Sequence, residues 1–581
     1  MKPHPLWHVG FLSVLAALPS FAVASTPLPG PANLQRLHDV LRTQALPAPR
    51  DISLTLPTLP PPTPNQDKED ARVTLTGVEI QGATLLPAET LGKLLEPISG
   101  QETSLAAIDA VVANITHTYR AQGYFLGRAN LPPQQFENGR LLIHVVEGRV
   151  DDIRVNGAEH VQANALVRSI VARLKAKSTP TSKDVETALL QLNTLPGITA
   201  QGTLSPAETP GGAILTLNLH DTQGDVSLGF NNHGTRYIGP NRFEMGATVH
   251  NVLAPWGDTL AVQALQDPNG SDLTLVDSTY SLPLNSLGTT ASLNLSKGIS
   301  RPEWTLEDLD INSRTFGAGL TLTQNLHRTR ALAWDVYGTL DWADADSTSS
   351  GLQLSADHTR TLRLGTRTTT LDDLQGFTTM DAKLSQGLDL LGGTARNSLG
   401  SSRLRGTGVD FTKANVDVSR LQRLNEVWNL VLSGSGQYST HALLAGDEFG
   451  LGGPTGFGRG YDSNELTGEH GLAAKAELQA TFTPAWPWLD AWQLFGFYDY
   501  GAVWNKDRDV LEDNTAKTLA SVGMGVRLQF SPNLNAEVMM VKPTTREVQS
   551  TNNDNATIYF RLNSKVDFET LGALRKGKPA S

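Results

Sequence analysis

Apolar and polar residues alternate at every second position in many segments of the C-terminal part of the chain. In residues 331–342, one face carries mainly leucine, valine and tryptophan, and the other carries aspartate, threonine and tyrosine. Residues 428–433 and 557–563 follow the same pattern. Such segments of about ten residues are typical of strands that have one face toward lipid and one toward water. A soluble β-sandwich also alternates, so one such segment does not decide between the two architectures.

Upstream, the chain contains two copies of one α/β unit. The segments GVEIQGA at 77–83 and DIRVNGA at 152–158 share the same order of apolar residues, glycine and alanine. Each begins with a strand of period two, which is followed by two segments with helical spacing and two further strands. The predicted helices cover 87–95, 104–122, 161–174 and 182–192, and the later strands cover 125–131, 140–147, 198–204 and 214–219. The pattern therefore predicts a tandem β-α-α-β-β module.

The N-terminal residues divide into three segments. Residues 1–24 combine Lys2, an apolar stretch and a final Ala-Val-Ala, which is typical of a cleaved signal peptide. An anchoring helix is the alternative, but Pro19 interrupts the stretch and no stop-transfer charges follow. Within 25–45, leucines at helical spacing predict an amphipathic helix over 33–44. Residues 46–71 are proline-rich and predict a semi-rigid tether, so the helix is either a movable element or part of a solvated spacer.

The lengths of the remaining segments favour a membrane barrel. No later apolar run reaches the roughly eighteen residues of a transmembrane helix, so only a closed barrel can span a membrane. At about ten residues per tilted strand plus turns, the C-terminal part accommodates about sixteen antiparallel strands. Tryptophan and tyrosine near the segment ends agree with an interfacial girdle. We divide the chain after residue 71 into a first module (72–149), a second module (150–222), a barrel (223–568) and a tail (569–581).

Composition excludes several functions. The chain has no cysteine, which removes thiol catalysis, thiolate metal sites and disulfides. A net charge of -11 argues against nucleic acid as a partner, because a basic surface is needed to bind phosphates. The 13 histidines show no metal-binding spacing, and no G-x-S-x-G motif is present. A carboxylate pair of Asp499 and Glu448 could be imagined in a glycosidase, but lone acids are more commonly ion-pair partners. We therefore expect no catalytic residues, metal or cofactor.

A glycine-rich loop at 452–471, GGPTGFGRGYDSNELTGEHG, contains the strongest candidate site. A phosphate-binding loop would open a helix and carry Gly-Lys-Ser/Thr, whereas here Arg459 is followed by Gly460 and Tyr461 and no helical pattern begins. Inside a barrel lumen, an arginine requires a carboxylate, with which it forms two directed hydrogen bonds. A solvated arginine in a surface loop is the alternative.

These residues resemble known motifs. The two modules are similar to POTRA domains, which precede the outer-membrane barrels of the BamA superfamily. Arg459-Gly460-Tyr461 resembles the loop-six motif Val-Arg-Gly-Tyr/Phe of two-partner secretion transporters, the TpsB or FhaC/ShlB/HecB family, with Gly458 in place of the usual apolar residue. FYDYG at 497–501 resembles the F-x-D-x-G strand motif of that family. Weaker similarities involve 231–243, 280–284 and 541–543.

The resemblance implies roles for individual residues. Asp499 of the strand motif would receive Arg459, and the helix in 25–45 would plug the pore. The supporting residues that the resemblance implies are Phe497, Gly501, Glu448, Gly452 and Gly453.

The resemblance also implies a function. The protein would lie in the outer membrane of a Gram-negative cell, with POTRA domains in the periplasm, and would export a large hemolysin- or adhesin-like exoprotein by two-partner (type Vb) secretion. The POTRA domains would capture the N-terminal secretion domain of this client by strand addition, unless they are only spacers. We expect the client and outer-membrane lipid as partners of a monomeric protein that is not an enzyme. The alternative is a BamA-like factor that inserts other barrels. A passive porin does not account for the modules.

Overall fold

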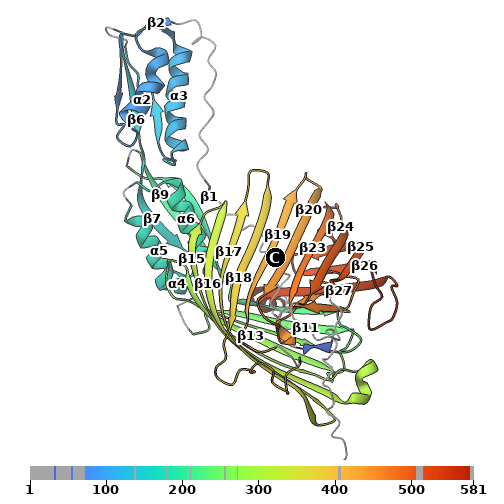
Figure 1. The fold of residues 1–581 in the computed structure, drawn as a ribbon. Helices are drawn as coiled ribbons and strands as arrows, with labels where there is room; N and C mark the ends of the chain where they lie inside the picture. The colour runs from blue at the N-terminus through green and yellow to red at the C-terminus, as the bar shows by residue number, and fades with distance from the viewer. Residues whose placement is uncertain are drawn as a thin grey trace, which may run out of the picture.

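The computed structural model describes most of the chain after residue 71. The described residues are 32–34, 54–55, 72–135, 139–177, 179–209, 211–253, 257–270, 272–403, 407–505 and 515–575. The predicted signal peptide lies outside them, as does the predicted helix over 33–44 apart from Asn33 and Leu34. Two small α/β modules lead into one closed barrel (Figure 1). No helix in the described ranges has the length and hydropathy of a membrane span.

The first module packs two helices against a small sheet. Its elements are β2 (Arg72–Thr74), β3 (Gly77–Gln81), α2 (Ala88–Leu95), the 3-10 helix η4 (Glu96–Ile98), β4 (Glu102–Ser104), α3 (Leu105–Ala121), β5 (Arg128–Asn130) and β6 (Arg140–Val146). Ser104 caps α3 by accepting a hydrogen bond from the backbone N–H of Ala107. One face of α3, including Ile108 and Ile115, is buried against β6, which pairs in parallel with β3. The helical spacing in the sequence therefore predicted the core of this module.

Glu147, directly after β6, ties this strand to the segment before α2. Its carboxylate accepts hydrogen bonds from the backbone N–H groups of Thr84 (2.5 Å) and Leu85 (2.6 Å). It also accepts from the hydroxyls of Thr84 (2.5 Å) and Tyr119 (2.8 Å). Burial would raise the pKa of Glu147, but these hydrogen bonds favour the charged form and hold the pKa below its usual value. The carboxylate is therefore ionised in the folded module.

We expect this contact to lose its stabilising effect in acid, because a carboxylate with a lowered pKa stabilises the fold only while it is ionised. Its contribution is complete above the usual glutamate pKa of 4.5 and is lost as the pH falls through the lower pKa of the folded state. Amide hydrogen exchange at Thr84 and Leu85, corrected for intrinsic rates, should therefore accelerate in the full-length protein below pH 4.5. Glu147→Gln should exchange faster throughout and remove this pH dependence. Constant protection across this range would contradict the assignment.

The second module repeats the architecture with one difference. Its elements are β7 (Arg149–Asn156), α4 (Glu159–Ala163), α5 (Ala165–Lys175), α6 (Ser182–Leu192), β8 (Ile198–Pro206) and β9 (Gly212–Asp221). The prediction of one helix over 161–174 was wrong, because Asn164 has ψ 126° and separates α4 from α5. Its side chain accepts hydrogen bonds from the N–H groups of Leu166 and Val167, so it ends one helix and caps the next. Polar side-chain capping at Asn164 outweighed the apolar periodicity.

The two modules are in contact with each other. A strand over 125–131 was predicted, but β5 is shorter, and Phe125 and Leu126 pack against the core of the second module instead. The N–H of Ser182, at the start of α6, donates to the carbonyl of Gly123 at 2.8 Å. The apolar pair at 125 and 126 therefore belongs to the interface between the modules.

The barrel consists of sixteen antiparallel strands, which confirms the predicted architecture and strand number. Its strands are β10 (Gly224–Asn231), β11 (Arg242–His250), β12 (Thr259–Gln266), β13 (Leu273–Pro283), β14 (Thr289–Ser300), β15 (Ile311–Arg328), β16 (Leu332–Ser349), β17 (Leu352–Leu371), β18 (Gly376–Gly387), β19 (Thr412–Arg423), β20 (Trp428–Ser439), β23 (His470–Phe482), β24 (Ala491–Trp504), β25 (Lys517–Ser531), β26 (Leu534–Pro543) and β27 (Thr557–Asp567). The first and last strands pair, from Asp225 with Asp567 to Asn231 with Arg561, so no sheet edge remains open. Alternation sets the two faces: along β24, Phe497 and Asp499 are buried, while Tyr498 is 52% exposed.

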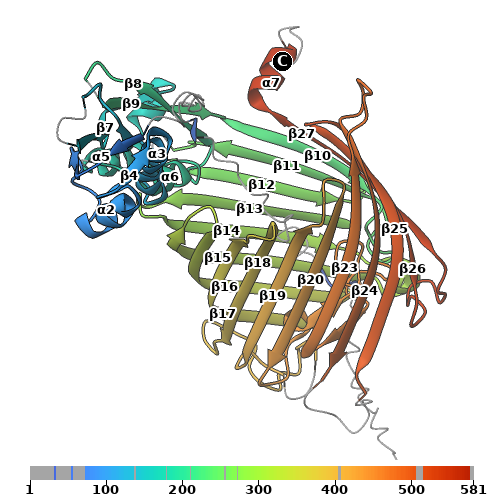
Figure 2. The ribbon, with the colours of Figure 1, turned by 90° about the horizontal axis from the view of Figure 1, so that it is seen from above.

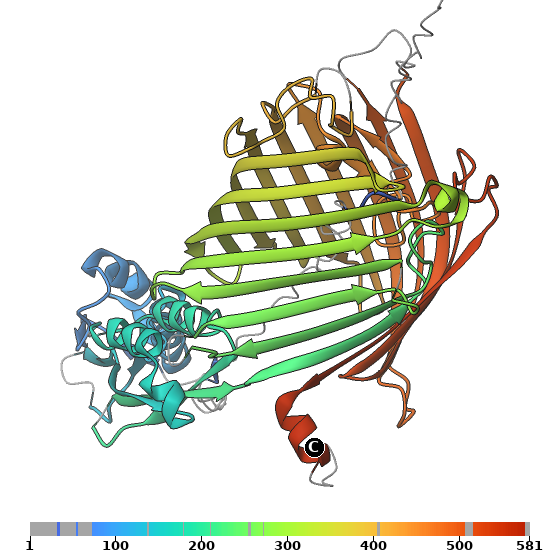
Figure 3. The same cartoon turned by 90° about the horizontal axis from the view of Figure 1, so that it is seen from below.

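A helix that the sequence did not predict follows the last strand of the barrel. Residues at the start of the tail form α7 (Phe568–Arg575), which projects from the end of β27 (Figures 2 and 3). The carboxylate of Asp567 accepts hydrogen bonds from the N–H (2.6 Å) and hydroxyl (3.0 Å) of Thr570. This capping starts a helix where the strand pairing ends.

The second module is attached to the turns at one end of the barrel. Arg173 of α5 donates to the hydroxyl (2.5 Å) and carbonyl (2.8 Å) of Ser286, in the turn between β13 and β14. Arg330, between β15 and β16, forms an ion pair with Glu186 of α6 at 3.0 Å. These contacts fix the module beside the barrel mouth (Figure 3).

Candidate functional site in the barrel lumen

The segment between β20 and β23 folds back against the inner wall of the barrel. It contains the 3-10 helix η7 (Ala445–Asp447) and a hairpin of β21 (Phe449–Leu451) and β22 (Leu466–Gly468). Leu451 and Tyr461 are buried in an apolar cluster with Val503 of β24 and Leu519 of β25. Because these wall residues face inward, the loop lies inside the lumen.

The structure brings Arg459 of this loop together with Asp499 of β24. The guanidinium donates through Nη2 to Oδ1 at 2.9 Å and through Nε to Oδ2 at 3.0 Å, and the backbone N–H of Arg459 donates to Oδ2 at 3.0 Å. Ser521 of β25 adds a hydroxyl donor at 3.3 Å. Arg459 is 5% exposed and Asp499 is fully buried. The two parallel hydrogen bonds between the guanidinium and the carboxylate define both the position and the orientation of Arg459, whereas a single hydrogen bond would leave its orientation free.

A second carboxylate, Glu477 of β23, completes the contacts of Arg459. Its Oε2 accepts from Nη1 at 2.5 Å, and its Oε1 accepts from Arg527 of β25 at 2.8 Å. Arg527 also binds Glu537 of β26 at 2.6 Å. The charges therefore alternate along one network of contacts, from Asp499 through Arg459, Glu477 and Arg527 to Glu537. The sequence analysis missed Glu477, although its alternation with Ala476 and Leu478 placed it on the polar face of the strand.

Phe497 contributes a flat surface beneath the arginine. The Cζ atom of Arg459 lies 3.3 Å from the centroid of the Phe497 ring, and Arg527 lies 3.9 Å from that of Phe495. Such stacking orients a guanidinium and is favourable where water is excluded. The predicted F-x-D-x-G residues thus supply both the ring and the carboxylate that hold Arg459.

The residues next to Arg459 require close approach to the wall. Gly458 has φ +94°, and a Cβ there would lie 2.2 Å from Leu519, so the usual apolar residue would not fit this conformation. A Cβ at Gly460 would lie 2.8 Å from the backbone nitrogen of Pro543. The hydroxyl of Tyr461 contacts that of Thr545 at 3.0 Å and accepts from the N–H of Arg546 at 3.2 Å. The tripeptide therefore binds the wall and the loop after β26.

The remaining predicted residues lie at the base of the loop. Glu448 pairs with Arg403 of the β18–β19 loop at 3.0 Å rather than with Arg459. Glu469, at the other end of the loop, binds the same Arg403 nitrogen at 2.9 Å. Gly452 and Gly453 lie in the turn directly after β21, where the Gly453 N–H donates to the Tyr461 carbonyl at 3.0 Å. Since Glu448 and Asp499 bind different arginines, the structure does not present them as one carboxylate pair.

Gly501 lies under the hairpin. A Cβ at this position would lie 2.6 Å from the side chain of Leu451. The last residue of the F-x-D-x-G motif therefore leaves room for the loop on the inner wall.

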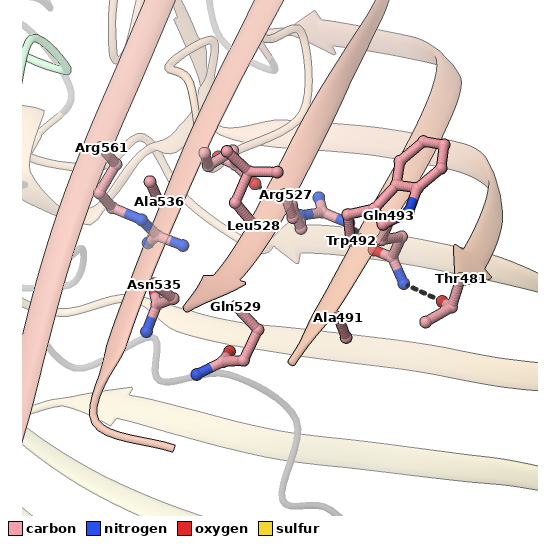
Figure 4. Close-up of a pocket in the computed structure, with 11 residues that line it drawn as sticks. Thr481, Ala491, Trp492, Gln493, Arg527, Leu528, Gln529, Asn535, Ala536 and Arg561 are labelled. Atoms are coloured by element: carbon pink, nitrogen blue, oxygen red, sulfur yellow. Dashed lines mark hydrogen bonds and ion pairs between the residues drawn. The ribbon is translucent and has the colours of Figure 1, made fainter. Parts of the chain in front are cut away.

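A cavity of about 300 Å³ opens beside the charged network, toward the mouth where the modules attach. Figure 4 shows Arg527, Gln493 and Arg561 among its lining residues. Gln493 donates to the Thr481 hydroxyl at 2.9 Å and accepts from Arg527 at 2.7 Å. The cavity lining therefore combines the polar groups of Gln493, Arg527 and Arg561 with the apolar surface of Trp492 and Leu528.

Two short N-terminal segments contact the barrel and the second module. Ala32 and Leu34 are buried with Tyr237, Ile238 and residues of β12 and β13 that face the lumen. Leu54 and Thr55 form β1, which pairs in parallel with Gly202 and Thr203 of β8. The interpretation of the linker as an unpacked tether was therefore wrong at β1, where alternating apolar residues between prolines favour a strand.

Comparison of the sequence with known protein families identifies the family to which this chain belongs. The profile of the haemolysin secretion/activation protein ShlB/FhaC/HecB matches residues 213–528, which is more than half of the chain. The profile of the POTRA domain, ShlB-type, matches residues 73–148. The heme/hemopexin transporter protein HuxB of Haemophilus influenzae is 24% identical over 505 residues, covering 84% of this chain and 86% of HuxB. A HuxB sequence from strain 86-028NP is 30% identical over 208 residues, a match that spans 36% of that protein.

Solved structures share the fold. CdiB from Escherichia coli aligns with a TM-score of 0.66 and 21% identity, covering 92% of this chain and 96% of CdiB. BamA from Haemophilus ducreyi, lacking POTRA domains 1-3, aligns with a TM-score of 0.51 and 15% identity, covering 85% of this chain and all of that one. At these identities the similarity concerns the architecture.

Proposed function

Because the chain belongs to the haemolysin secretion/activation protein family ShlB/FhaC/HecB, we propose that it moves one large exoprotein from the periplasm to the cell surface. Members of this family are outer-membrane two-partner secretion transporters with periplasmic POTRA domains. The barrel is closed by pairing of its own first and last strands, which supports a monomer. No step in this function requires a cofactor or a catalytic group.

The observation that carries the proposal is the buried fork between Arg459 and Asp499 inside a barrel preceded by two POTRA-type modules. Desolvation offsets much of the energy of a buried ion pair, so such a pair contributes more to a defined position than to stability. We assign Arg459 the role of holding the lumenal loop, with Asp499, Glu477 and Phe497 as its receptor. In this position the loop shapes the path of the exported chain.

The modules supply a site for the client. Strand β1 shows that the β8 edge of the second module accepts an extended segment as an added strand. Client recognition by strand addition uses the same backbone groups, and alternating side chains give it selectivity. The client would then be presented beside the barrel mouth, because Arg173 and Glu186 attach the module there.

Fractionation and export together test this function. We expect the chain to sediment with outer membranes and to resist carbonate extraction. Coexpression with a large, repetitive exoprotein encoded beside it should release that exoprotein at the cell surface, and omission of this chain should leave it in the periplasm. A soluble periplasmic product, or export that does not need this chain, would contradict the proposal.

The N-terminal segment provides a test of the plug. Deleting residues 33–44 should raise single-channel conductance in planar bilayers, because the deletion removes Leu34, which is buried against residues that face the lumen. Leu34→Ser should raise conductance less, and export should fall only mildly in both variants. Conductance equal to that of the wild type after the deletion would exclude a plug in this segment.

A BamA-like insertion factor is the second candidate function. The same architecture supports it, but the structural match to BamA is weaker than that to CdiB. Secretion of one client therefore remains the function that we propose.

A further inference from the structure

The outward face of the barrel carries few lysine or arginine residues. Within the described strands, the register and the alternation of exposure place five of them on this face. They are Lys297, Arg314, Arg360, Arg420 and Lys542. A cation that faces lipid is destabilising unless it is paired, lies near the interface or binds a ligand. Each of the five is therefore expected to have a partner, a position near the interface or a bound ligand.

Three of the five cations have a carboxylate partner in this chain. Arg360 binds Asp344 at 2.7 Å and lies 3.3 Å from the centroid of the Trp342 ring. Arg420 binds Asp372 at 2.7 Å, and Lys542 lies 3.5 Å from Asp554. Neutralisation within the protein accounts for these positions.

Lys297 of β14 and Arg314 of β15 differ from these three. Across the part of the chain that the structure describes, neither makes an ion pair, a side-chain hydrogen bond or a ring contact. Arg314 is opposite Asp346 in the register, but the Asp346 carboxylate is 3.4 Å from His358. Lys297 pairs with Phe316, two positions from Arg314, so the two cations are diagonal neighbours. They form one exposed basic pair on adjacent strands.

The basic pair lies at the upper limit of the apolar band. Along β15, Leu326 is 51% exposed and Phe316 is 46% exposed. Ten residues of a strand tilted by about 45° rise about 24 Å, which matches the height of about 25 Å typical of an apolar band. Arg314 lies two residues before Phe316, near the start of β15, whereas Arg330 in the turn after β15 contacts the second module. The start of β15 is therefore at the end of the barrel remote from the POTRA modules, which is the cell-surface side (Figure 2). The pair thus lies where headgroups of the outer leaflet begin.

The surroundings of the pair are suited to acyl chains. Val276 and Phe316 are exposed on either side of Lys297, as its partners in the neighbouring strands. Leu293, Leu295, Leu320 and Leu340 are exposed below the pair. Two cations above an apolar surface match a lipid that has phosphate in its headgroup and several chains. A soluble phosphate would use the cations but not the apolar surface.

We propose that Lys297 and Arg314 form a binding site for the phosphorylated glycolipid of the outer leaflet. The ammonium and guanidinium groups bind its phosphate oxygens, and the acyl chains pack along the outward faces of β13–β16. The phosphate supplies the negative charge that the chain itself supplies to Arg360, Arg420 and Lys542. This site is independent of the lumenal loop and of client export.

Lipid titration of the purified full-length protein in detergent tests the site. The probe is bisphosphorylated lipid A, and the readout is the heat-induced loss of the folded band on gels, from which an apparent Kd is obtained. Lys297→Ala with Arg314→Ala should weaken binding about thirtyfold, because each cation near a charged surface increases the affinity about fivefold. Arg420→Ala, an outward cation near the opposite end of the barrel, is the matched control and should change the Kd less than about twofold.

Four outcomes would overturn the proposal, and the first three come from the alanine variants and the comparison of lipids. These are unchanged affinity in the double alanine variant, an equal loss in Arg420→Ala, and equally tight binding of phosphatidylglycerol to the wild type. If the alanine variant does not fold, Lys297→Gln with Arg314→Gln replaces it. Exchange of the two cations, Lys297→Arg with Arg314→Lys, should retain most of the affinity, and its loss would also contradict a site based on charge.

Discussion

Deletion of residues 72–221 is expected to abolish export of the client while leaving an inserted barrel. The modules contain the edge of β8 at which strand addition is seen, whereas the barrel strands close without them. Export is measured as client released to the medium, and insertion as the heat-modifiable mobility of the barrel on gels. The truncated protein should be folded in the membrane but inactive.

A smaller change provides the control for this deletion. Arg173→Ala removes the contacts with Ser286 but leaves both modules intact, so export should be reduced rather than lost. Normal export by the truncated protein would mean that the modules act only as spacers and do not recognise the client. Loss of the folded barrel would show that the modules are needed for assembly.

The large features of the fold could be predicted because they follow from periodicity. Alternation determines which face of a strand is buried. Because each strand of a membrane barrel needs about ten residues, the length of the segment sets the number of strands. The helical spacing of Ile108 and Ile115 likewise gave the core of the first module. Local capping was harder to detect: Asn164 divides a continuous apolar pattern, and Asp567 starts α7 directly after the last strand.

The candidate site was predictable only where its residues belong to a motif. Arg459 and Asp499 were expected together because both loop and strand motifs resembled those of one family. Glu477 and Arg527 belong to no such motif, and their contacts depend on strand register across the barrel. Alternation could have placed both on the lumenal face, but not beside Arg459. The partner of Glu448, Arg403, comes from a different loop and left no signal in the sequence.

Arg459→Ala is expected to reduce export severely while the barrel remains folded. The substitution removes the fork and leaves the carboxylate of Asp499 fully buried without its cation. Breaking a buried pair in this way typically costs about 3–5 kcal/mol, which is sufficient to release the loop. The strand ladders, which provide most of the stability of a barrel, are unchanged. Arg459→Lys should also be impaired, because an ammonium cannot form the two-point contact.

Another lumenal ion pair gives a matched control. Arg367 of β17 pairs with Asp381 of β18 at 2.8 Å, and both are barrel-strand residues that face the lumen. Arg367→Ala should therefore change export little. A loss as severe as that of Arg459→Ala would mean that export responds to any lumenal charge rather than to the position of the loop.

The most direct test of the central claim is a double-mutant cycle on the export rate. It compares the wild type, Arg459→Ala, Asp499→Ala and the double variant at equal amounts of folded barrel. If the two residues act through their shared contact, each single substitution removes it, and the double variant should export about as slowly as either single one. Strictly additive defects, or export at the normal rate by Arg459→Ala, would contradict the account.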